Sequence, residues 1–444
     1  MPKKKTALTM EERLQQALVP AEEQPYEVPE NWVWVRLENV ASWGSGGTPS
    51  RKHEEYYNGD ILWIKTGELN NGWIYDTEEK ITDEGLKKSS AKLFPTNSVL
   101  IAMYGATIGK VAILGVPATT NQACACAVCN QSLLYMYLFY YCISQKNVFI
   151  EKGKGGAQPN ISQIILKQHP IPLPPLSEQQ RIVERIEELF AKLDEAKERL
   201  QEAADSFAVR KAAILHKAFT GELTKQWRCE NGVSDESWEE KKLGEVVLLL
   251  SGQDFPPAKY NSDGNGIPYI TGASNFDNTH VLINRWTDEP SVIAQENDVL
   301  LVCKGSGYGK TIIADFKEAH IARQIMALRV KEIIDNNLLL YYLRNKNRFI
   351  KEQGQGLIPG LSRKVILSLT INLPTLPEQH KIVRLIDDLL ARERKAQQAT
   401  EQALASIDLM KKSILARAFR GELGTNKASE ASALELLKQV LAEN

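Results

Sequence analysis

Two long stretches of this chain repeat apolar or small residues in alternating steps of four and three. This spacing is typical of the seam of a coiled coil. The first seam is Ile182, Ile186, Leu189, Leu193, Ala196, Leu200, Ala203 and Phe207, and the second is Ile382, Ile386, Leu389, Ala396, Ala403, Ile407, Met410 and Ile414. Glu393 and Thr400 also fall on the second seam, where polar groups would fix the register. The simplest partner for one seam is the other, because a lone helix would leave its apolar stripe in water.

The first of these helices has start and stop signals. Pro175 ends the preceding segment, Ser177 is the expected N-cap, and Gln180 stands three residues later as in a capping box. Nothing breaks a helix from there to Phe219, which predicts a length of roughly 64 Å. Gly221 then provides a plausible stop.

The segments that precede the two helices mix short β-branched runs with turn signals. Residues 97–103 and 297–303 are expected to be buried strands that enter a glycine-rich turn, and residues 133–149 are expected to be helical. We therefore predict the α+β class, with two mixed α/β domains joined by two long antiparallel helices that form a coiled coil. Antiparallel pairing would place the domains at opposite ends of a rod, as a pseudo-twofold repeat.

An internal repeat supports this architecture. Residues 171–183 (IPLPPLSEQQRIV) recur 200 residues later as 371–383 (INLPTLPEQHKIV), and residues 214–223 (ILHKAFTGEL) recur at the same offset as 414–423 (ILARAFRGEL). Two matches at one offset exclude chance. The globular parts match more loosely.

The repeat divides the chain into parts whose boundaries we predict. They are an N-terminal segment (1–32), a first globular domain (33–176), a central long helix (177–223), a linker (224–237), a second globular domain (238–376), a C-terminal long helix (377–423) and a tail helix (424–444).

Composition narrows the class of protein only slightly. The chain has 43% hydrophobic and 25% charged residues, which is ordinary for a soluble globular protein. The longest apolar stretch, 133–143, has only about half of the roughly 20 residues that a membrane-spanning helix needs. Residues 1–5 are basic, but Glu11, Glu12 and Arg13 follow where a secretory signal would be apolar. We expect a cytoplasmic protein.

The formal net charge of −1 neither favours nor excludes a nucleic-acid partner. If the chain binds DNA, it does so through local patches or with help from a partner.

Two glycine-rich turns carry a lysine at the same place. Residues 105–110 (GATIGK) and 305–311 (GSGYGKT) superficially resemble a phosphate-binding loop, but that loop needs four residues between the first glycine and the Gly-Lys pair, and here there are three. One interpretation is a tight hairpin turn. The other is that Lys110 and Lys310 contact DNA phosphate, which the recurrence of the lysine favours.

The run Cys124–Cys129 holds three cysteines, spaced closely enough to chelate zinc. The repeat favours a core position instead. Aligning Gln122 with Gln324 places Met326 and Leu328 at the positions of the first two cysteines. Six cysteines in a chain of this size do not suggest a disulfide framework.

Polar and basic loop residues of both domains suit base edges or phosphate, although any solvated loop looks similar. The candidate DNA contacts are Thr48, Arg51, Lys52, Asn70, Lys110 and Gln122 in the first domain and Asn275, Lys304, Lys310, Arg323 and Gln324 in the second. The sequence has no His-rich metal signature, no nucleophile with its base, and no cofactor turn of an adenine methyltransferase. We expect a chain that recognises DNA and does not transform it, with no metal and no catalytic residue.

A domain that ends in Leu-Pro-x-Leu-x-Glu-Gln-x-x-Ile-Val, followed by a long helix that ends in Ala-Phe-x-Gly-Glu-Leu, occurs twice and resembles the specificity subunit of type I restriction–modification enzymes. Residues 29–37 (PENWVWVRL) are similar to the entry of that family's first target recognition domain, and the resemblance covers roughly residues 29–423.

The resemblance implies that each globular domain is a target recognition domain that reads one half of a split DNA site. The paired helices would set the gap between the halves and dock two modification subunits. Those partners would methylate adenine with S-adenosylmethionine, and restriction subunits would add ATP- and Mg-dependent translocation and cleavage, so no cofactor is expected in this chain. Because the two domains diverge, we predict an asymmetric target.

Residues that match the family's helix motif are candidates for packing or for docking of a partner. They are Glu178, Gln179, Ile182, Ile186, Glu378, Gln379, Ile382 and Ile386. Two alternatives stay open at this stage: a coiled-coil scaffold whose globular ends bind other proteins, and an ATPase that uses the Gly-Lys turns.

Overall fold

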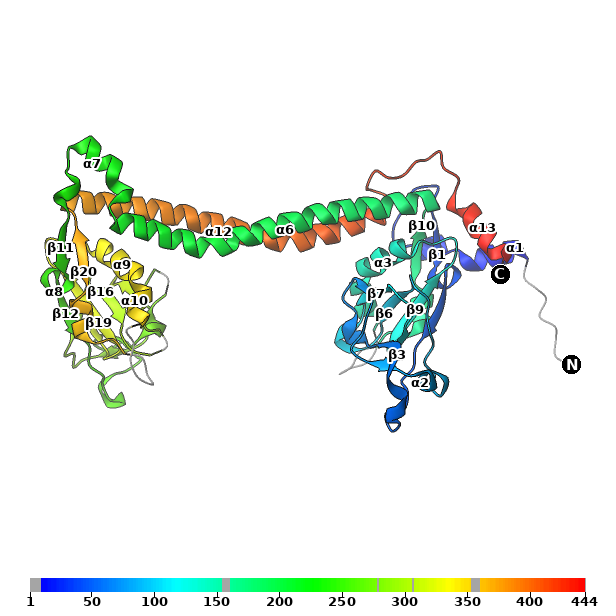
Figure 1. Ribbon diagram of the computed structural model, residues 1–444, viewed down its shortest axis with the longest axis horizontal. Helices are drawn as coiled ribbons and strands as arrows, with labels where there is room; N and C mark the ends of the chain where they lie inside the picture. Colours follow the sequence, from blue (N-terminus) through cyan, green and yellow to red (C-terminus); the bar gives the residue numbers. More distant parts are fainter. Residues whose placement is uncertain (1–8, 154–159, 278, 306, 353–359, 444) are drawn as a thin grey trace. The chain divides into compact units, whose positions relative to one another are not determined.

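The chain forms two compact units in the computed structural model. Unit 1 comprises residues 1–199 and 403–444, and unit 2 comprises residues 200–402. Each unit contains a mixed α/β domain and parts of two long helices (Figure 1). The structure describes residues 9–153, 160–277, 279–305, 307–352 and 360–443, so the basic stretch at residues 1–5 lies outside the described residues.

The two long helices are α6 (Leu176–Phe219) and α12 (Leu376–Ala418). The expected N-cap of α6 is wrong, because the helix begins before Ser177 and the Ser177 hydroxyl donates instead to Glu430 Oε2 over 3.0 Å. Gly221 follows the helix with φ of 78°, a left-handed conformation that suits glycine and helps to end the helix.

Within each unit α6 and α12 run antiparallel, side by side (Figure 1). In unit 1, Leu415 and Ala418 at the end of α12 share a hydrophobic core with Ile182 near the start of α6. In unit 2, Ala218 near the end of α6 shares a core with Ile382 near the start of α12. The predicted antiparallel coiled coil is confirmed.

Three expected seam positions, Ala196, Ala396 and Met410, are exposed. Beyond Ile407 the contact stripe moves from Met410 to Lys411, whose ammonium group lies 2.6 Å from Asp194 Oδ1. The reason is geometric: a strict seven-residue repeat drifts around a helix with 3.6 residues per turn, so the facing position shifts along the helix.

Unit 1 contains three sheets among its described residues. Their strand orders are β2-β9-β6-β7-β4, β5-β3-β8 and β1-β10. The strands are β1 (Val33–Arg36), β2 (Ala41–Ser45), β3 (Tyr57–Ile64), β4 (Trp73–Ile74), β5 (Lys80–Ile81), β6 (Val99–Ala102), β7 (Val111–Leu114), β8 (Thr119–Thr120), β9 (Cys124–Cys129) and β10 (Pro170–Leu173). The helices are α1 (Met10–Ala17), α2 (Asp83–Lys87), α3 (Tyr135–Ser144), α4 (Lys146–Lys152), α5 (Gln163–Lys167) and α13 (Ala433–Glu443).

Unit 2 repeats this plan. Its strand orders are β12-β19-β16-β17, β14-β13-β18-β15 and β11-β20. The strands are β11 (Glu239–Lys242), β12 (Val247–Ser251), β13 (Ile267–Ile270), β14 (Trp286–Thr287), β15 (Ile293–Gln295), β16 (Val299–Val302), β17 (Thr311–Ile313), β18 (Glu318–Ile321), β19 (Ile325–Val330) and β20 (Thr370–Leu373). The helices are α7 (Lys225–Asn231), α8 (Leu243–Val246), α9 (Asn336–Asn345), α10 (Asn347–Glu352) and α11 (Arg363–Leu367). The predicted α+β class is confirmed.

The strand register corrects the alignment of the two domains. Cys124 and Ile325 hold the same place, each opposite the last residue of the neighbouring strand, β6 or β16. The expected alignment of Gln122 with Gln324 is therefore wrong by one residue, and Gln122 corresponds to Arg323. Because side chains alternate across a strand, a slip of one residue exchanges the two faces of the sheet.

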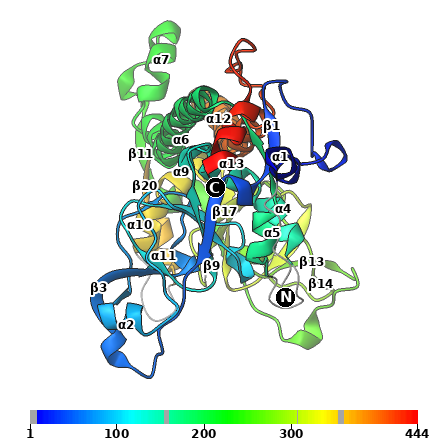
Figure 2. The same cartoon turned by 90° about the vertical axis from the view of Figure 1, so that its right-hand side faces the viewer.

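The two chain-terminal helices of unit 1, α1 and α13, pack against each other (Figures 1 and 2). The Arg13 guanidinium donates to the carbonyl of Leu441 over 3.0 Å. The Ala433 amide donates to the carbonyl of Asn31 over 3.0 Å. The segment after α12 is thereby tied to the segment before β1. No helix of the described residues is long and apolar enough to cross a membrane.

Candidate nucleic-acid interface

In unit 1 the ends of several strands meet at one edge of the domain. Since β2 and β6 both run antiparallel to β9, their carboxyl ends lie beside the start of β9. β3 ends there as well, because Ile64 pairs with Thr120 just before β9. The loops at this edge hold Thr48, Gln122 and Lys110, and we call it the loop edge of unit 1.

Unit 2 builds the equivalent edge in the same way. β12 and β16 run antiparallel to β19, and the Ala322 amide donates to the carbonyl of Ile270 at the end of β13. The loops at this edge hold Lys304, Lys310 and the neighbouring pair Arg323–Gln324, and we call it the loop edge of unit 2. The fold thus brings most of the sequence-predicted contacts of each domain to one edge.

The two glycine-rich turns are tight hairpins. In unit 1 the Lys110 amide donates to the Thr107 carbonyl over 2.9 Å, and in unit 2 the Lys310 amide donates to the Gly307 carbonyl over 3.0 Å. Each turn leads into a strand, β7 or β17, and not into a helix. A phosphate-binding loop needs free amides at the start of a helix, so these turns lack its geometry and do not support the ATPase alternative.

The lysine side chains of these turns are available to a ligand. Lys304 and Lys310 are exposed and Lys110 is half-buried, and across the described residues none of the three takes part in an ion pair. A free ammonium group at the same turn of both domains is suited to a phosphate oxygen.

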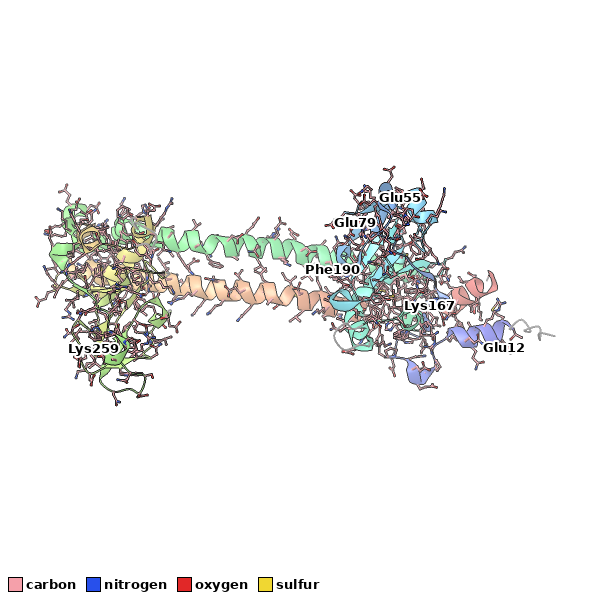
Figure 3. The ribbon with its side chains drawn as sticks, turned by 90° about the horizontal axis from the view of Figure 1, so that it is seen from below. Glu12, Glu55, Glu79, Lys167, Phe190 and Lys259 are labelled. Atoms are coloured by element: carbon pink, nitrogen blue, oxygen red, sulfur yellow. The ribbon has the colours of Figure 1, made fainter. Side chains whose placement is uncertain are left out.

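Other predicted residues of unit 1 are held by neighbours. The Thr48 hydroxyl donates to Gln122 Oε1 over 2.5 Å, which joins two predicted contacts. Arg51 lies 2.7 Å from Glu79 Oε2, and its guanidinium stands 4.4 Å from the centre of the Tyr57 ring. Figure 3 shows Glu79 on the part of unit 1 built around β3, away from Glu12 of α1. DNA phosphate would have to compete with this carboxylate for Arg51.

Lys52 and Asn70 are exposed on the surface of unit 1. Next to Asn70, Asn71 accepts a hydrogen bond from the Val111 amide over 3.2 Å, directly beside Lys110. The Asn70 loop is therefore anchored at the start of β7, while Lys52 has no contact with another described residue that places it at the loop edge.

In unit 2, Arg323 pairs with Asp254 over 2.5 Å but stays 67% exposed. Gln324 is exposed, and its Oε1 would lie 2.8 Å from a Cβ at Gly272. The amide of Gln324 therefore lies across the turn that follows β13.

Asn275 is unsuited to the DNA contact expected of it. Its side chain is fully buried, and its Oδ1 accepts from the Thr271 and Gly272 amides while its Nδ2 donates to the Leu282 carbonyl. A side chain that satisfies three backbone groups is not free to meet a base. Asn275 organises its loop instead.

The eight helix-motif residues that were expected to pack or to dock a partner are all fully buried. Gln179 accepts from the Leu134 amide over 2.9 Å and donates to the Ser132 carbonyl, and Gln379 makes the matching bonds to Asp335 and Ile333. The isoleucines belong to the cores of their own units. These residues pack a helix onto its domain, which agrees with the packing interpretation, whereas docking of a partner at this motif stays a prediction.

The sequence did not reveal which groups donate hydrogen bonds to the two buried glutamates, Glu178 and Glu378. Glu378 accepts from Arg228 Nη1 and from the Thr224 hydroxyl, each over 2.7 Å. In the other copy Glu178 accepts from the Trp32 indole over 2.9 Å, and burial raises the pKa of Glu178. The available signal was the recurrence of a tryptophan directly before the first strand of each domain, Trp32 before β1 and Trp238 before β11.

The cysteines of β9 do not form a common site. Cys124 and Cys126 are fully buried on one face of the sheet, whereas Cys129 lies on the other face, against the second core. Burial raises the pKa of the Cys126 and Cys129 thiols to about 12. Cys124 and Cys126 face a core as expected, and the three sulfurs do not converge.

Comparison with known proteins agrees with the repeat. The model of the type I restriction modification DNA specificity domain matches residues 29–204 and 235–403, well over half of the chain. The chain is 27% identical over 409 residues to the specificity subunit of the type I restriction enzyme MjaX of Methanocaldococcus jannaschii, covering 86% of this chain and 92% of that protein.

It is also 26% identical over 453 residues to the type I restriction enzyme StySPI specificity subunit of Salmonella potsdam, covering 94% and 96% of the two chains. Among solved structures, the HsdS subunit from Thermoanaerobacter tengcongensis matches with a TM-score of 0.69 at 24% identity, covering 90% of this chain and 100% of that chain. This last likeness concerns the fold.

Proposed function

The chain belongs to the type I restriction modification DNA specificity family, and from that premise we propose that its two globular domains read the two halves of one bipartite, asymmetric DNA target. The domains are residues 33–176 and 238–376. The chain itself is non-catalytic, and methylation and cleavage take place on partner subunits.

The observation that carries this proposal is the recurrence of a free lysine at the same hairpin turn of both loop edges. Lys110 and Lys310 stand at the start of β7 and β17, with the same backbone hydrogen bonds before them. Two equivalent cations position two equivalent domains on phosphates, because phosphate contacts set register without reading sequence.

The residues beside these lysines differ between the units, and this difference supports an asymmetric target. Gln122 of unit 1 corresponds to Arg323 of unit 2 by the strand register. Glutamine suits the edge of adenine and arginine that of guanine in the major groove. Of the predicted contacts we retain Thr48, Arg51, Asn70 and Gln122 for one half-site and Lys304, Arg323 and Gln324 for the other, together with the two turn lysines.

We further propose that the paired helices α6 and α12 set the gap between the half-sites, that two modification subunits bind the chain, and that restriction subunits join the same assembly. The near-neutral formal charge of −1 supports this division, because partners can provide part of the phosphate contact that drives affinity.

Selection of duplexes from a random pool by this chain, assembled with its purified modification subunit, tests the proposal. The expected result is a two-part consensus with unlike halves and a fixed gap. A complex that methylates DNA yet selects a palindrome would contradict asymmetric reading, and one that selects no sequence would contradict DNA reading altogether.

A further inference from the structure

The two-stranded ribbon at the start of each domain is covered in unit 1 and open in unit 2. In unit 1, β1 has β10 on one side and a further extended segment on the other, where Leu18 bridges Val35 and the Val19 amide donates to the Trp34 carbonyl over 2.9 Å. In the described part of unit 2, β11 pairs with β20 alone.

Helix α13 completes the cover in unit 1. Ala433 and Leu437 are fully buried and belong to the same hydrophobic core as Val35 and Leu173 of the ribbon. Ala433 and Leu437 stand four positions apart, so they lie on one face of the helix.

An ion pair fixes the approach to α13. The Arg181 guanidinium donates to both carboxylate oxygens of Glu430 over 2.9 and 2.8 Å, and the Ser177 hydroxyl donates to the same carboxylate. Glu430 lies three residues before the helix. A paired, two-pronged contact of this kind sets both the position and the direction of the segment.

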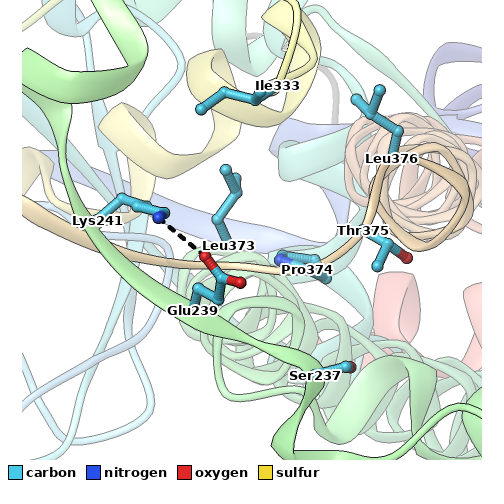
Figure 4. A pocket seen from close by; sticks show the side chains of 8 residues that line it. All are labelled: Ser237, Glu239, Lys241, Ile333, Leu373, Pro374, Thr375 and Leu376. Carbon is cyan, nitrogen blue, oxygen red and sulfur yellow. Dashed lines mark ion pairs between the residues drawn. The ribbon is translucent and has the colours of Figure 1, made fainter.

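The corresponding place in unit 2 is a pocket of about 320 Å³. Figure 4 shows Leu373 pointing towards Ile333, with Lys241 on one side and Leu376 at the start of α12. Ile333 is 47% exposed and Leu376 39% exposed. In unit 1 the residue at the place of Ile333 is Ser132, which is fully buried.

The walls of the two sites correspond residue by residue. Leu373 repeats Leu173, and Lys241 stands where Val35 stands in unit 1, opposite Ile371 and Ile171. Lys381 repeats Arg181, 200 residues later. Lys381 has no ion-pair partner in the part of the chain that the structure describes.

We propose that the open ribbon pocket of unit 2 is a docking site for an amphipathic helix of a partner protein. The occupant has small or aliphatic residues four positions apart, as in Ala433 and Leu437, that cover Ile333 and Leu376. An acidic residue shortly before its helix pairs with Lys381, as Glu430 pairs with Arg181 in unit 1.

The occupant belongs to a partner because the α13 of this chain is already committed. Its apolar face is buried in unit 1, and Arg13 and Arg181 hold its two ends through Leu441 and Glu430. Moving α13 to unit 2 would expose one apolar site in order to cover another. Lys241 of the pocket lining pairs with Glu239 over 2.8 Å. Lys381, which repeats Arg181, is therefore the cation that we expect to pair with an acidic residue of the occupant.

A synthetic, fluorescently labelled peptide of residues 424–443 is a suitable probe, since it has the required spacing of acidic and apolar residues. Its anisotropy on titration with the full chain should show one saturable site. Leu376→Glu and Ile333→Ser should each weaken binding by about tenfold or more, which corresponds to about 1.4 kcal/mol. Leu248→Glu, at an exposed leucine of the same unit outside the pocket, should leave binding unchanged.

The ion pair has its own test. Lys381→Glu should weaken binding of the natural peptide and strengthen binding of a peptide in which Glu430 is replaced by lysine. The proposal is overturned if the wild-type chain shows no saturable binding up to roughly 1 mM peptide. It is equally overturned if Leu376→Glu and Ile333→Ser bind as the wild type does, because the peptide would then be displacing α13 in unit 1.

Discussion

Trp32 donates its indole N–H to Oε2 of Glu178 over 2.9 Å. In the other unit Trp238 makes the same bond to Glu378 over 3.1 Å. Each bond joins the first turn of a long helix to the residue before the first strand of its domain. Because an unpaired buried carboxylate is strongly destabilising, these donors explain why the motif glutamates are compatible with the core.

The buried ion pair of unit 2 provides the first prediction. Arg228 Nη1 lies 2.7 Å from Glu378 Oε1, with side chains 7% and 0% exposed. Replacing Arg228 by leucine leaves the carboxylate without its charge partner and should lower the free energy of unfolding by about 3 kcal/mol. Denaturant unfolding of the full chain, with hydrogen exchange of the unit 2 amides as the readout, measures this loss.

Arg210→Leu is the matched control, because the Arg210 side chain is 42% exposed where it pairs with Glu393. An exposed pair of this kind contributes about 0–1 kcal/mol. Equal losses for Arg228→Leu and Arg210→Leu would contradict the structural role of the buried pair. Adding Glu378→Gln to Arg228→Leu should recover part of the stability.

Substitutions at Asn275 and Gln324 should separate effects on stability from effects on DNA recognition. Asn275→Ala leaves the Thr271 and Gly272 amides without their acceptor and should cost about 1–3 kcal/mol of stability. Gln324→Ala, at an exposed side chain, should leave the melting temperature unchanged and alter the bases selected at one half-site. A changed consensus in a fully stable Asn275→Ala protein would refute this division.

Much of the architecture could be predicted from sequence because helix periodicity is a local signal and the repeat keeps one constant offset of 200 residues in its helical part. The long helices, the glycine turns and the strands that precede them follow from such patterns. What could not be predicted is which face a strand turns to its core. Aligning Gln122 with Gln324 in place of Arg323 is a slip of one residue, which leaves the local pattern intact but exchanges the two faces of the strand.

The burial of individual polar side chains was the other property that could not be predicted from the sequence. Asn275 looks like any polar loop residue until the backbone around it is known, and Gln179 looks like a helix-surface residue until its amide is found on the Ser132 carbonyl. Polar residues in repeated motifs are ambiguous because structural capping and ligand contact need the same donors and acceptors. Tertiary contacts decide between them.

Lys310 should act on affinity and not on sequence preference. Lys310→Ala is expected to weaken binding similarly to cognate and unrelated duplexes and to reduce the slope of log K against log salt by about 0.9, the value of one phosphate contact. Lys331→Ala is the control, since Lys331 follows the opposite end of β19 from Gln324. Titrations at several salt concentrations measure the slope.

An unchanged slope in Lys310→Ala would remove this lysine from the interface. The purified chain is also expected to hydrolyse no nucleoside triphosphate, with or without Lys310, because the Tyr308, Gly309 and Lys310 amides of this turn are already bonded to carbonyls and the turn leads into a strand. Measurable hydrolysis by the chain alone would contradict the hairpin interpretation.

His169 makes the stability of unit 1 depend on pH. Burial, together with the nearby Lys152 ammonium, lowers the pKa of His169 to about 3. Among the described residues, Tyr141 and Lys152 are the titratable groups in contact with its ring. Between about pH 6.5 and pH 3 the unfolded chain binds a proton that the folded chain does not, so stability is complete above this window and falls as the pH is lowered through it.

The free energy of unfolding of unit 1 is expected to fall by up to about 1.4 kcal/mol for each pH unit within this window. His169→Leu should remove this fall, and unit 2 shows that leucine is accepted, because Leu369 makes the same backbone bond to Leu243 that His169 makes to Leu37. Unfolding of the wild type and the variant at pH 7 and pH 5 provides the comparison. Parallel losses in both proteins would assign the acid sensitivity to other groups.

The helices should act as the ruler of the proposed DNA target. Deleting one heptad from each, residues 199–205 and 399–405, retains the Lys411–Asp194 contact in unit 1 and the Arg210–Glu393 contact in unit 2. Seven residues of helix correspond to about 10 Å, or about three base pairs at 3.4 Å each. The gap in the selected or methylated site should shorten by that amount, with both half-sites unchanged. Deleting the heptad from one helix only is the control, since it places Asp194 and Lys411 out of register and should impair assembly. If the double deletion forms an active complex with an unchanged gap, the coiled coil does not set the spacing.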